Sequence, residues 1–133
     1  MKIDSTSVQV TAPQTEVFAF LQDARNFSHL LPQDKISDWS ATEDQCSFKV
    51  QGGITITLVQ NGTADGNKVL MKSGEKSPFP FNLTIHVKES GSETEGYIAF
   101  EGEVNMFLKM MVEKPLTNLF NYMSTKLMEH YQK

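Results

Sequence analysis

The sequence predicts an α+β fold, in which a curved antiparallel β-sheet of six or seven strands wraps around one long C-terminal helix. Three observations lead to this prediction. Apolar and polar residues alternate through the middle of the chain, as they do in half-buried strands. The stretch 106–131 carries apolar residues at helical spacing, and residues 13–32 contain two short helical patterns. At 133 residues, the chain is expected to form a single domain over residues 1–133.

The opening segment predicts a strand followed by two short helices. Val8 and Val10 alternate with polar neighbours, and Pro13 lies where a helix can begin, because the first helical turn needs no amide donor. Asp23 and Asn26 are typical capping and turn residues. The apolar residues of the first helix are Val17, Phe18, Phe20 and Leu21, and those of the second, which Pro32 ends, are Phe27, Leu30 and Leu31.

The middle of the chain predicts an antiparallel meander with one apolar and one polar face. Turns are expected at Gly52-Gly53, over the polar segment Asn61 to Gly66, and from Ser90 to Glu93. Pro78 and Pro80 place the start of one strand at an edge or a bend. The expected inward residues are Cys46, Phe48, Val50, Ile54, Ile56, Leu58, Val69, Met71, Phe79, Phe81, Leu83, Ile85, Val87, Ile98, Phe100 and Val104.

A sheet with one apolar face needs a covering layer, and the C-terminal helix supplies it. Its apolar stripe is Val112, Leu116, Leu119, Met123 and Leu127. Pro115 interrupts the hydrogen-bond ladder, so we expect a kink or a break near Lys114. The first half of this helix is apolar on all sides, which predicts that all its sides are buried.

The order of these short motifs resembles one known superfamily. The residues that carry the resemblance are Ala12-Pro13, Val17 to Leu21 followed by Asp23, Asn26-Phe27, Leu31-Pro32, Trp39 and the apolar stretch Met106 to Leu127. This pattern resembles the START-like superfamily, also called SRPBCC or the helix-grip fold, which includes polyketide cyclases, birch-pollen-allergen-like proteins and coenzyme Q-binding proteins. The resemblance implies a cavity between the last helix and the sheet.

The function expected from this resemblance is binding or transport of a small hydrophobic ligand that is lipid-, quinone- or polyketide-like. Methionine is flexible and polarizable, which suits a cavity wall, but each candidate can equally be ordinary core. The candidate cavity-lining residues are Trp39, Phe48, Ile56, Phe81, Leu83, Ile85, Phe100, Met106, Met110, Met111 and Tyr122.

Composition argues against several other function classes. The net charge of −4 and the pI near 5.3 argue against binding of nucleic acid or anionic lipid. Arg25 is the only arginine, which excludes an arginine cluster, and Cys46 has no intramolecular disulfide partner. The chain has no apolar signal core and no run as long as a membrane span, so we expect a cytoplasmic protein without stable membrane insertion.

Catalytic and metal-binding patterns are weak. His29, His86 and His130 have no metal-pair spacing, so no metal site and no cofactor are expected. Glu101 and Glu103 share the polar face of a strand, where solvated charges are usual. No catalytic residue is predicted.

Two alternatives remain open. A cyclase- or hydratase-like enzyme would need polar groups aimed into the cavity, and the inward candidates are the Trp39 N–H, Cys46 and the Tyr122 hydroxyl. Asp23, Arg25 and Asn26 could gate an opening, although capping explains them more simply. This shortage of inward polar groups favours binding over catalysis. In the other alternative, the methionine-rich helix surface is an interaction module, for example the interface of a homodimer.

Overall fold

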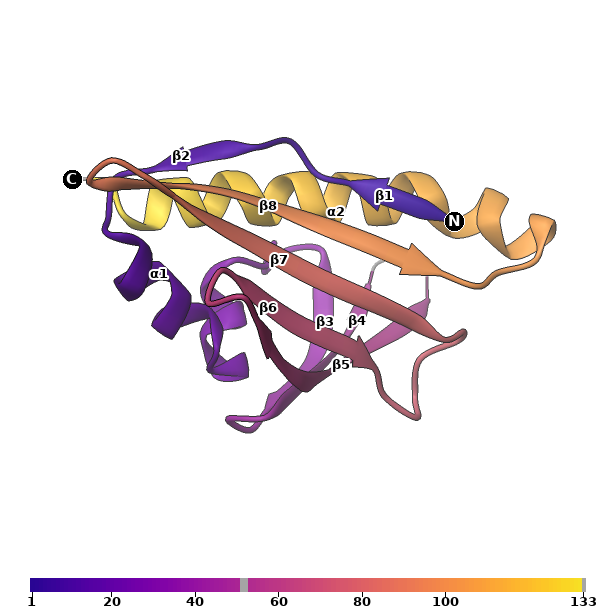
Figure 1. Ribbon diagram of the computed structural model, residues 1–133. Coiled ribbons are helices and arrows are strands. Elements are labelled where there is room, and N and C mark those ends of the chain that lie inside the picture. The colour runs from indigo at the N-terminus through magenta and orange to yellow at the C-terminus, as the bar shows by residue number, and fades with distance from the viewer. Residues whose placement is uncertain (51–52, 133) are drawn as a thin grey trace.

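The structure is a computed structural model, and it describes residues 1–50 and 53–132. Figure 1 shows a long C-terminal helix that lies along a curved sheet. The elements, in chain order, are β1 (Lys2–Asp4), β2 (Val8–Val10), α1 (Gln14–Leu21), the 3₁₀ helix η1 (Ala24–His29), β3 (Ile36–Ala41), β4 (Gln45–Val50), β5 (Ile54–Ala64), β6 (Lys68–Ser73), β7 (Phe81–Ser90), β8 (Glu93–Gly102) and α2 (Met106–His130).

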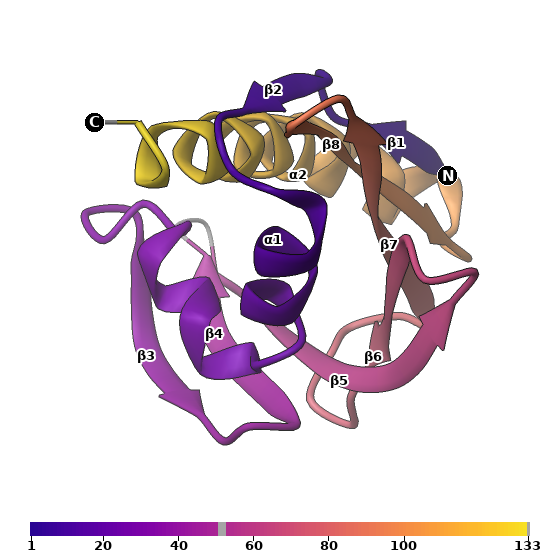
Figure 2. The same ribbon diagram turned by 60° about the vertical axis from the view of Figure 1, so that its left-hand side comes forward.

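The described residues form one eight-stranded antiparallel sheet in the order β1-β8-β7-β6-β5-β4-β3, and β2 also pairs with β8. Figure 2 shows that the sheet curls around α1 and α2. The predicted α+β helix-grip fold is therefore confirmed. The strand number exceeds the expected six or seven because the prediction placed the opening strand at Val8 and Val10, which is β2, and missed β1; both strands pair with β8.

Ser5 lies between β1 and β2 and forms hydrogen bonds at this edge of the sheet. Its N–H donates to the carbonyl of Ile98, and its hydroxyl accepts from the N–H of Ile98, both at 2.8 Å. The same hydroxyl lies 2.7 Å from the hydroxyl of Ser124 on α2. Ser5 thus joins the edge strand to the helix through a buried polar contact.

The helical elbow after β2 has the predicted capping chemistry. The carboxylate of Asp23 accepts from the N–H of Arg25 at 3.0 Å at the start of η1, and the side-chain amide of Asn26 donates to the carbonyl of Phe20 at 2.9 Å. Pro13 is the N-cap of α1 and precedes its first residue. The second short helix ends at His29, before Leu30 and Leu31, which are nonetheless buried.

The meander follows the prediction with three corrections. The polar segment from Asn61 to Gly66 is not all turn, because β5 runs on to Ala64. The tight turn has Asp65 and Gly66 at its centre, and both residues have positive φ, as a type I′ turn requires; the N–H of Asn67 donates to the carbonyl of Ala64 at 3.2 Å. Strand β7 begins at Phe81 and not at Phe79, and Val104 lies beyond the end of β8. Gln51 and Gly52, which include part of the predicted Gly52-Gly53 turn, lie outside the described residues.

Helix α2 buries all five residues of its predicted stripe. It continues through Pro115, so the break expected near Lys114 is absent. Proline removes the donor for the carbonyl of Met111, and both residues are exposed, so solvent can replace that hydrogen bond. No helix in the described part of the chain is long and apolar enough to cross a membrane.

We expect Ser5→Ala to lower the free energy of unfolding by about 1–3 kcal/mol, because it leaves the Ile98 N–H and the Ser124 hydroxyl without their buried partner. Urea unfolding of Ser5→Ala and of Ser7→Ala, which removes an exposed hydroxyl from the same edge, measures the difference. Equal effects of the two substitutions would contradict the structural role of Ser5.

A candidate ligand groove between the C-terminal helix and the sheet edge

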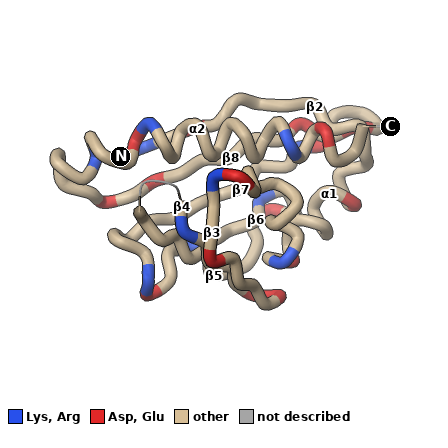
Figure 3. Tube along the Cα trace, turned by 180° about the vertical axis from the view of Figure 1, so that it is seen from behind, with Lys and Arg blue, Asp and Glu red and all other residues tan. Residues whose placement is uncertain are grey.

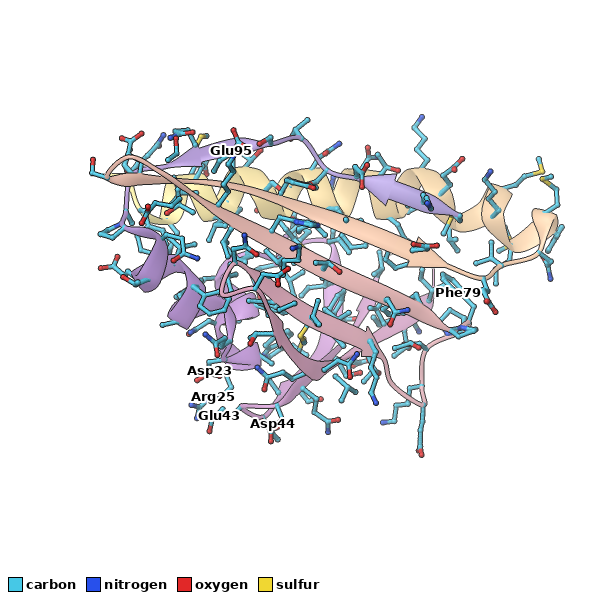
Figure 4. All side chains as sticks on the ribbon, viewed as in Figure 1. Asp23, Arg25, Glu43, Asp44, Phe79 and Glu95 are labelled. Carbon is cyan, nitrogen blue, oxygen red and sulfur yellow. The ribbon has the colours of Figure 1, made fainter. Side chains whose placement is uncertain are left out.

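The inner face of the sheet is fully packed where the sequence predicts a cavity wall. Six of the candidate residues are at most 4% exposed and belong to one core: Phe48, Ile56, Phe81, Leu83, Ile85 and Phe100. Phe81 and Phe100 have ring centroids 5.0 Å apart, and Phe120 of α2 lies 5.2 Å from Phe100. Phe79, labelled in Figure 4 near the start of β7, adds an edge-on contact to both strand phenylalanines. This aromatic cluster fills the space between α2 and one end of β7 and β8.

A small void remains under the other half of α2. Its volume is about 10 Å³, which is at the lower limit for one water molecule. Its walls include Leu21, Leu30, Ile85, Met123 and Leu127. This void therefore has no room for a ligand.

A larger opening lies where α2 passes the β3 edge of the sheet. This groove has a volume of about 290 Å³. Its floor is apolar, since Val50 and Leu119 are buried members of the core. The residues that line the groove are Pro32, Lys35, Ile36, Val50, Lys114, Pro115, Asn118, Leu119 and Tyr122.

The groove follows from the local structure of three elements. Pro32 and Lys35 lie in the connection between η1 and β3, and Ile36 begins β3. On α2, Lys114, Asn118 and Tyr122 are spaced by four residues and therefore share one helix face. That face is adjacent to the buried stripe, so the groove wall continues directly into the core.

The rim of the groove is positively charged. Lys35 and Lys114 are both exposed, and no carboxylate of the described residues lies within 4.0 Å of either ammonium group. Tyr122 is 36% exposed, and Lys126 lies over its ring with the ammonium nitrogen 5.7 Å from the centroid. The groove thus combines an apolar floor with two cations and a phenol at its edge.

Of the candidate residues predicted from sequence, only Tyr122 lines this groove. Trp39 lies at the edge of the core on β3, half-buried, with its ring stacked on Phe48 at a centroid distance of 6.4 Å. The sequence reasoning missed Lys35, Lys114 and Asn118. The four-residue spacing of the two α2 residues with Tyr122 was the available signal.

The three methionines at the start of α2 lie outside the core. Met106, Met110 and Met111 are 71%, 78% and 55% exposed. The expectation that the first half of α2 buries all its sides is therefore wrong. The reason is visible in Figure 1, where the first turns of α2 extend past the end of β8 and have no sheet beside them. Contact of these methionines with a ligand stays a prediction.

The cysteine and two of the histidines, which could be reactive, are buried or packed against aromatic rings. Cys46 is 1% exposed, and burial raises the pKa of its thiol to about 12. His29 and His130 come together with ring centroids 5.4 Å apart, and Phe20 packs against both. Sequence spacing could not reveal this pair, which joins η1 to the end of α2. Among the described residues, no group of three or more His, Cys, Asp or Glu side chains is arranged to hold a metal.

The charged residues of the elbow form a corner away from the groove. Figure 4 shows Asp23, Arg25, Glu43 and Asp44 close together, where η1 meets the turn between β3 and β4. Arg25 donates to Asp23 at 2.6 Å, which holds the pKa of this carboxyl below its usual value. The N–H of Ala24 donates to the carbonyl of Glu43 at 2.9 Å. Asp23, Arg25 and Asn26 therefore stabilise the elbow itself, while Ala24 joins it to the turn between β3 and β4, and none of the three lines the groove.

Comparison with known proteins gives structural matches alone. No sequence-family model matches the chain, and no curated protein is detectably similar to it in sequence. A START superfamily protein from Mycobacterium smegmatis superposes with a TM-score of 0.68 at 11% identity, over 98% of this chain and 99% of that chain. The KanY protein gives a TM-score of 0.78 at 13% identity, over 100% and 98% of the two chains. A protein from Thermus thermophilus gives 0.76 at 15% identity, over 98% and 97%.

These matches extend over nearly all of each chain at very low sequence identity, so they report on the fold. The architecture that they share with this protein is the one expected from its sequence motifs. The chain has the START-like, helix-grip fold.

Proposed function

We propose that this protein binds or transports a small hydrophobic molecule, and that the molecule enters at the groove between α2 and the β3 edge. The observation that carries the proposal is the 290 Å³ groove with the core residues Val50 and Leu119 as its floor. Ligand sites are mostly apolar concavities of about 300–1,000 Å³ with a few polar groups that fix orientation. The START-like fold, which can enclose a ligand between its sheet and its last helix, supports this function.

The groove also favours a class of ligand. An apolar body would lie over Val50, Leu119 and Ile36, and a negative or hydrogen-bond-accepting end would lie near Lys35 and Lys114. Lipid-, quinone- and polyketide-like molecules all have this division into an apolar body and oxygen-bearing groups. A ligand larger than the groove would reach the predicted inner-face residues, such as Phe48 and Ile56, when α2 moves away from the sheet.

The surroundings of the buried hydroxyls support binding over catalysis. Ser5 and Ser124 contact each other, and Thr94 donates to the carbonyl of Ala12 at 2.8 Å. These hydroxyls are thus engaged within the fold. A cyclase- or hydratase-like enzyme, which needs polar side chains free to act on a bound carbonyl, is the weaker proposal.

A protein-interaction module is the other alternative. The exposure of Met106, Met110 and Met111 favours it, because contiguous exposed apolar side chains often mark interaction sites. This role concerns the start of α2 and can coexist with a ligand in the groove.

We expect Asn118→Trp to weaken binding of the apolar fluorophore 1-anilinonaphthalene-8-sulfonate at least tenfold, because the indole would fill the groove from an exposed position. Fluorescence titration of the native protein measures the dissociation constant. Thr125→Trp is the matched control, since Thr125 is exposed on the same helix and does not line the groove. Equal binding by all three proteins would show that the groove is not the binding site.

Lys35→Gln combined with Lys114→Gln is expected to weaken binding of the same anionic fluorophore about fivefold, since exposed charge pairs contribute roughly 0.2–1 kcal/mol each. Binding of the neutral fluorophore N-phenyl-1-naphthylamine should change less than twofold. Titration of both fluorophores at low and high salt distinguishes the contribution of charge to binding from that of groove shape, because salt screens the exposed lysines. An equal loss for both fluorophores would instead indicate damage to the apolar floor.

A further inference from the structure

A compact apolar surface lies at the start of α2. It consists of Met106, Phe107, Met110 and Met111, which we call the tip patch. These side chains are 71%, 74%, 78% and 55% exposed, and with Tyr122 at 36% they are the large hydrophobic residues that the described surface leaves open. Exposed patches of this kind are typical of sites that contact a membrane or another protein.

From the position and the charge of the tip patch, we infer that it docks on the surface of a lipid bilayer. The first turns of α2 project beyond β8, so the patch can reach a flat surface before the rest of the protein does. Methionine and phenylalanine have the flexible or flat apolar side chains that enter the boundary between lipid headgroups and acyl chains.

The charge around the tip patch differs from that of the whole protein. The chain carries a net charge of −4, but the segment 104–114 contains two lysines and one glutamate. Lys109 pairs with that glutamate, Glu113, at 3.8 Å, whereas Lys114 has no carboxylate within 4.0 Å among the described residues. Figure 3 shows the projecting end of α2 as largely uncharged. A free lysine beside an apolar surface complements the phosphates of lipid headgroups.

The area of the tip patch fits a membrane contact better than a pair of subunits. Four side chains with these exposures offer on the order of 500 Å², compared with about 800 Å² per partner in a stable protein interface. A bilayer contact has no fixed size, since its strength increases with the apolar area that enters the bilayer. We therefore treat contact between two copies as an outcome that the experiment must exclude.

The tip patch is continuous with the groove. Phe107, Met111, Lys114, Asn118 and Tyr122 follow one another at three- and four-residue steps, so they form one stripe along α2. Docking through Phe107 and Met111 would thus turn the groove toward the bilayer. That consequence rests on the proposed function, whereas docking itself does not require a ligand in the groove.

The test is co-sedimentation of the ligand-free protein with vesicles of phosphatidylcholine, alone or mixed with phosphatidylglycerol. We expect the wild-type protein to sediment with both and more strongly with the mixture, because Lys114 lies beside the patch. The triple variant Phe107→Gln, Met110→Gln, Met111→Gln should bind at least tenfold more weakly. Met128→Gln, a methionine substitution at the far end of α2, should bind like the wild type.

Three results would overturn the inference. The wild-type protein could stay in the supernatant with both vesicles, or the triple variant could bind as well as the wild type. The third is a wild-type dimer in light scattering that the triple variant converts to a monomer, which would assign the patch to a second copy. Circular dichroism checks that the exposed substitutions leave the fold intact, and Phe107→Gln alone provides a milder variant. Fluorophore binding without vesicles reports separately on the groove.

Discussion

The burial of one stripe of α2 on the inner face of the sheet is the interaction on which the rest of this structure depends. The inner face carries Phe48, Leu83 and Ile85, which would otherwise meet water. Burial of a large apolar side chain contributes about 1.5–3 kcal/mol, so the five stripe residues contribute roughly 10 kcal/mol before the entropy of ordering is subtracted. This is comparable to the whole net stability of a typical domain, about 5–15 kcal/mol. Sheet and helix are therefore expected to fold as one unit.

The same packing decides where a ligand can bind. Phenylalanines close one end of the space beneath α2, and leucines, isoleucine and methionine reduce the other end to about 10 Å³. The core that stabilises the fold thus occupies the volume in which a cavity was expected. An apolar opening is present at the rim, where α2 leaves the sheet edge and the floor formed by Val50 and Leu119 meets solvent. For a ligand to bind deeper, some of these core side chains would have to move apart.

Periodicity in the sequence predicted those features that depend on neighbours along the chain. The alternation in β4 and β7 identified the inward residues, and the stripe of α2 is buried throughout. Features that depend on contacts between distant segments were not predictable. His29 and His130 meet because α2 ends beside the elbow, and the groove exists because α2 crosses the β3 edge at Pro115. The continuation of β5 to Ala64 was also missed. The polar residues around Gly62 are typical of a turn in the sequence, but in the structure Gly62 has a positive φ at a register shift within the strand.

The exposed start of α2 follows from the lengths of the elements. A helix of 25 residues spans roughly 38 Å, whereas a strand of 10 residues spans roughly 34 Å and crosses the helix at an angle. The buried stripe begins at Val112, so the six residues before it add about 9 Å of helix, of whose apolar side chains Leu108 alone packs against the core. Periodicity assigns a residue to a face of a helix but does not reveal where the opposing layer ends. An apolar helix face without an opposing layer is unfavourable in water. For this reason we expect Phe107 and its methionine neighbours to bind a partner outside the fold.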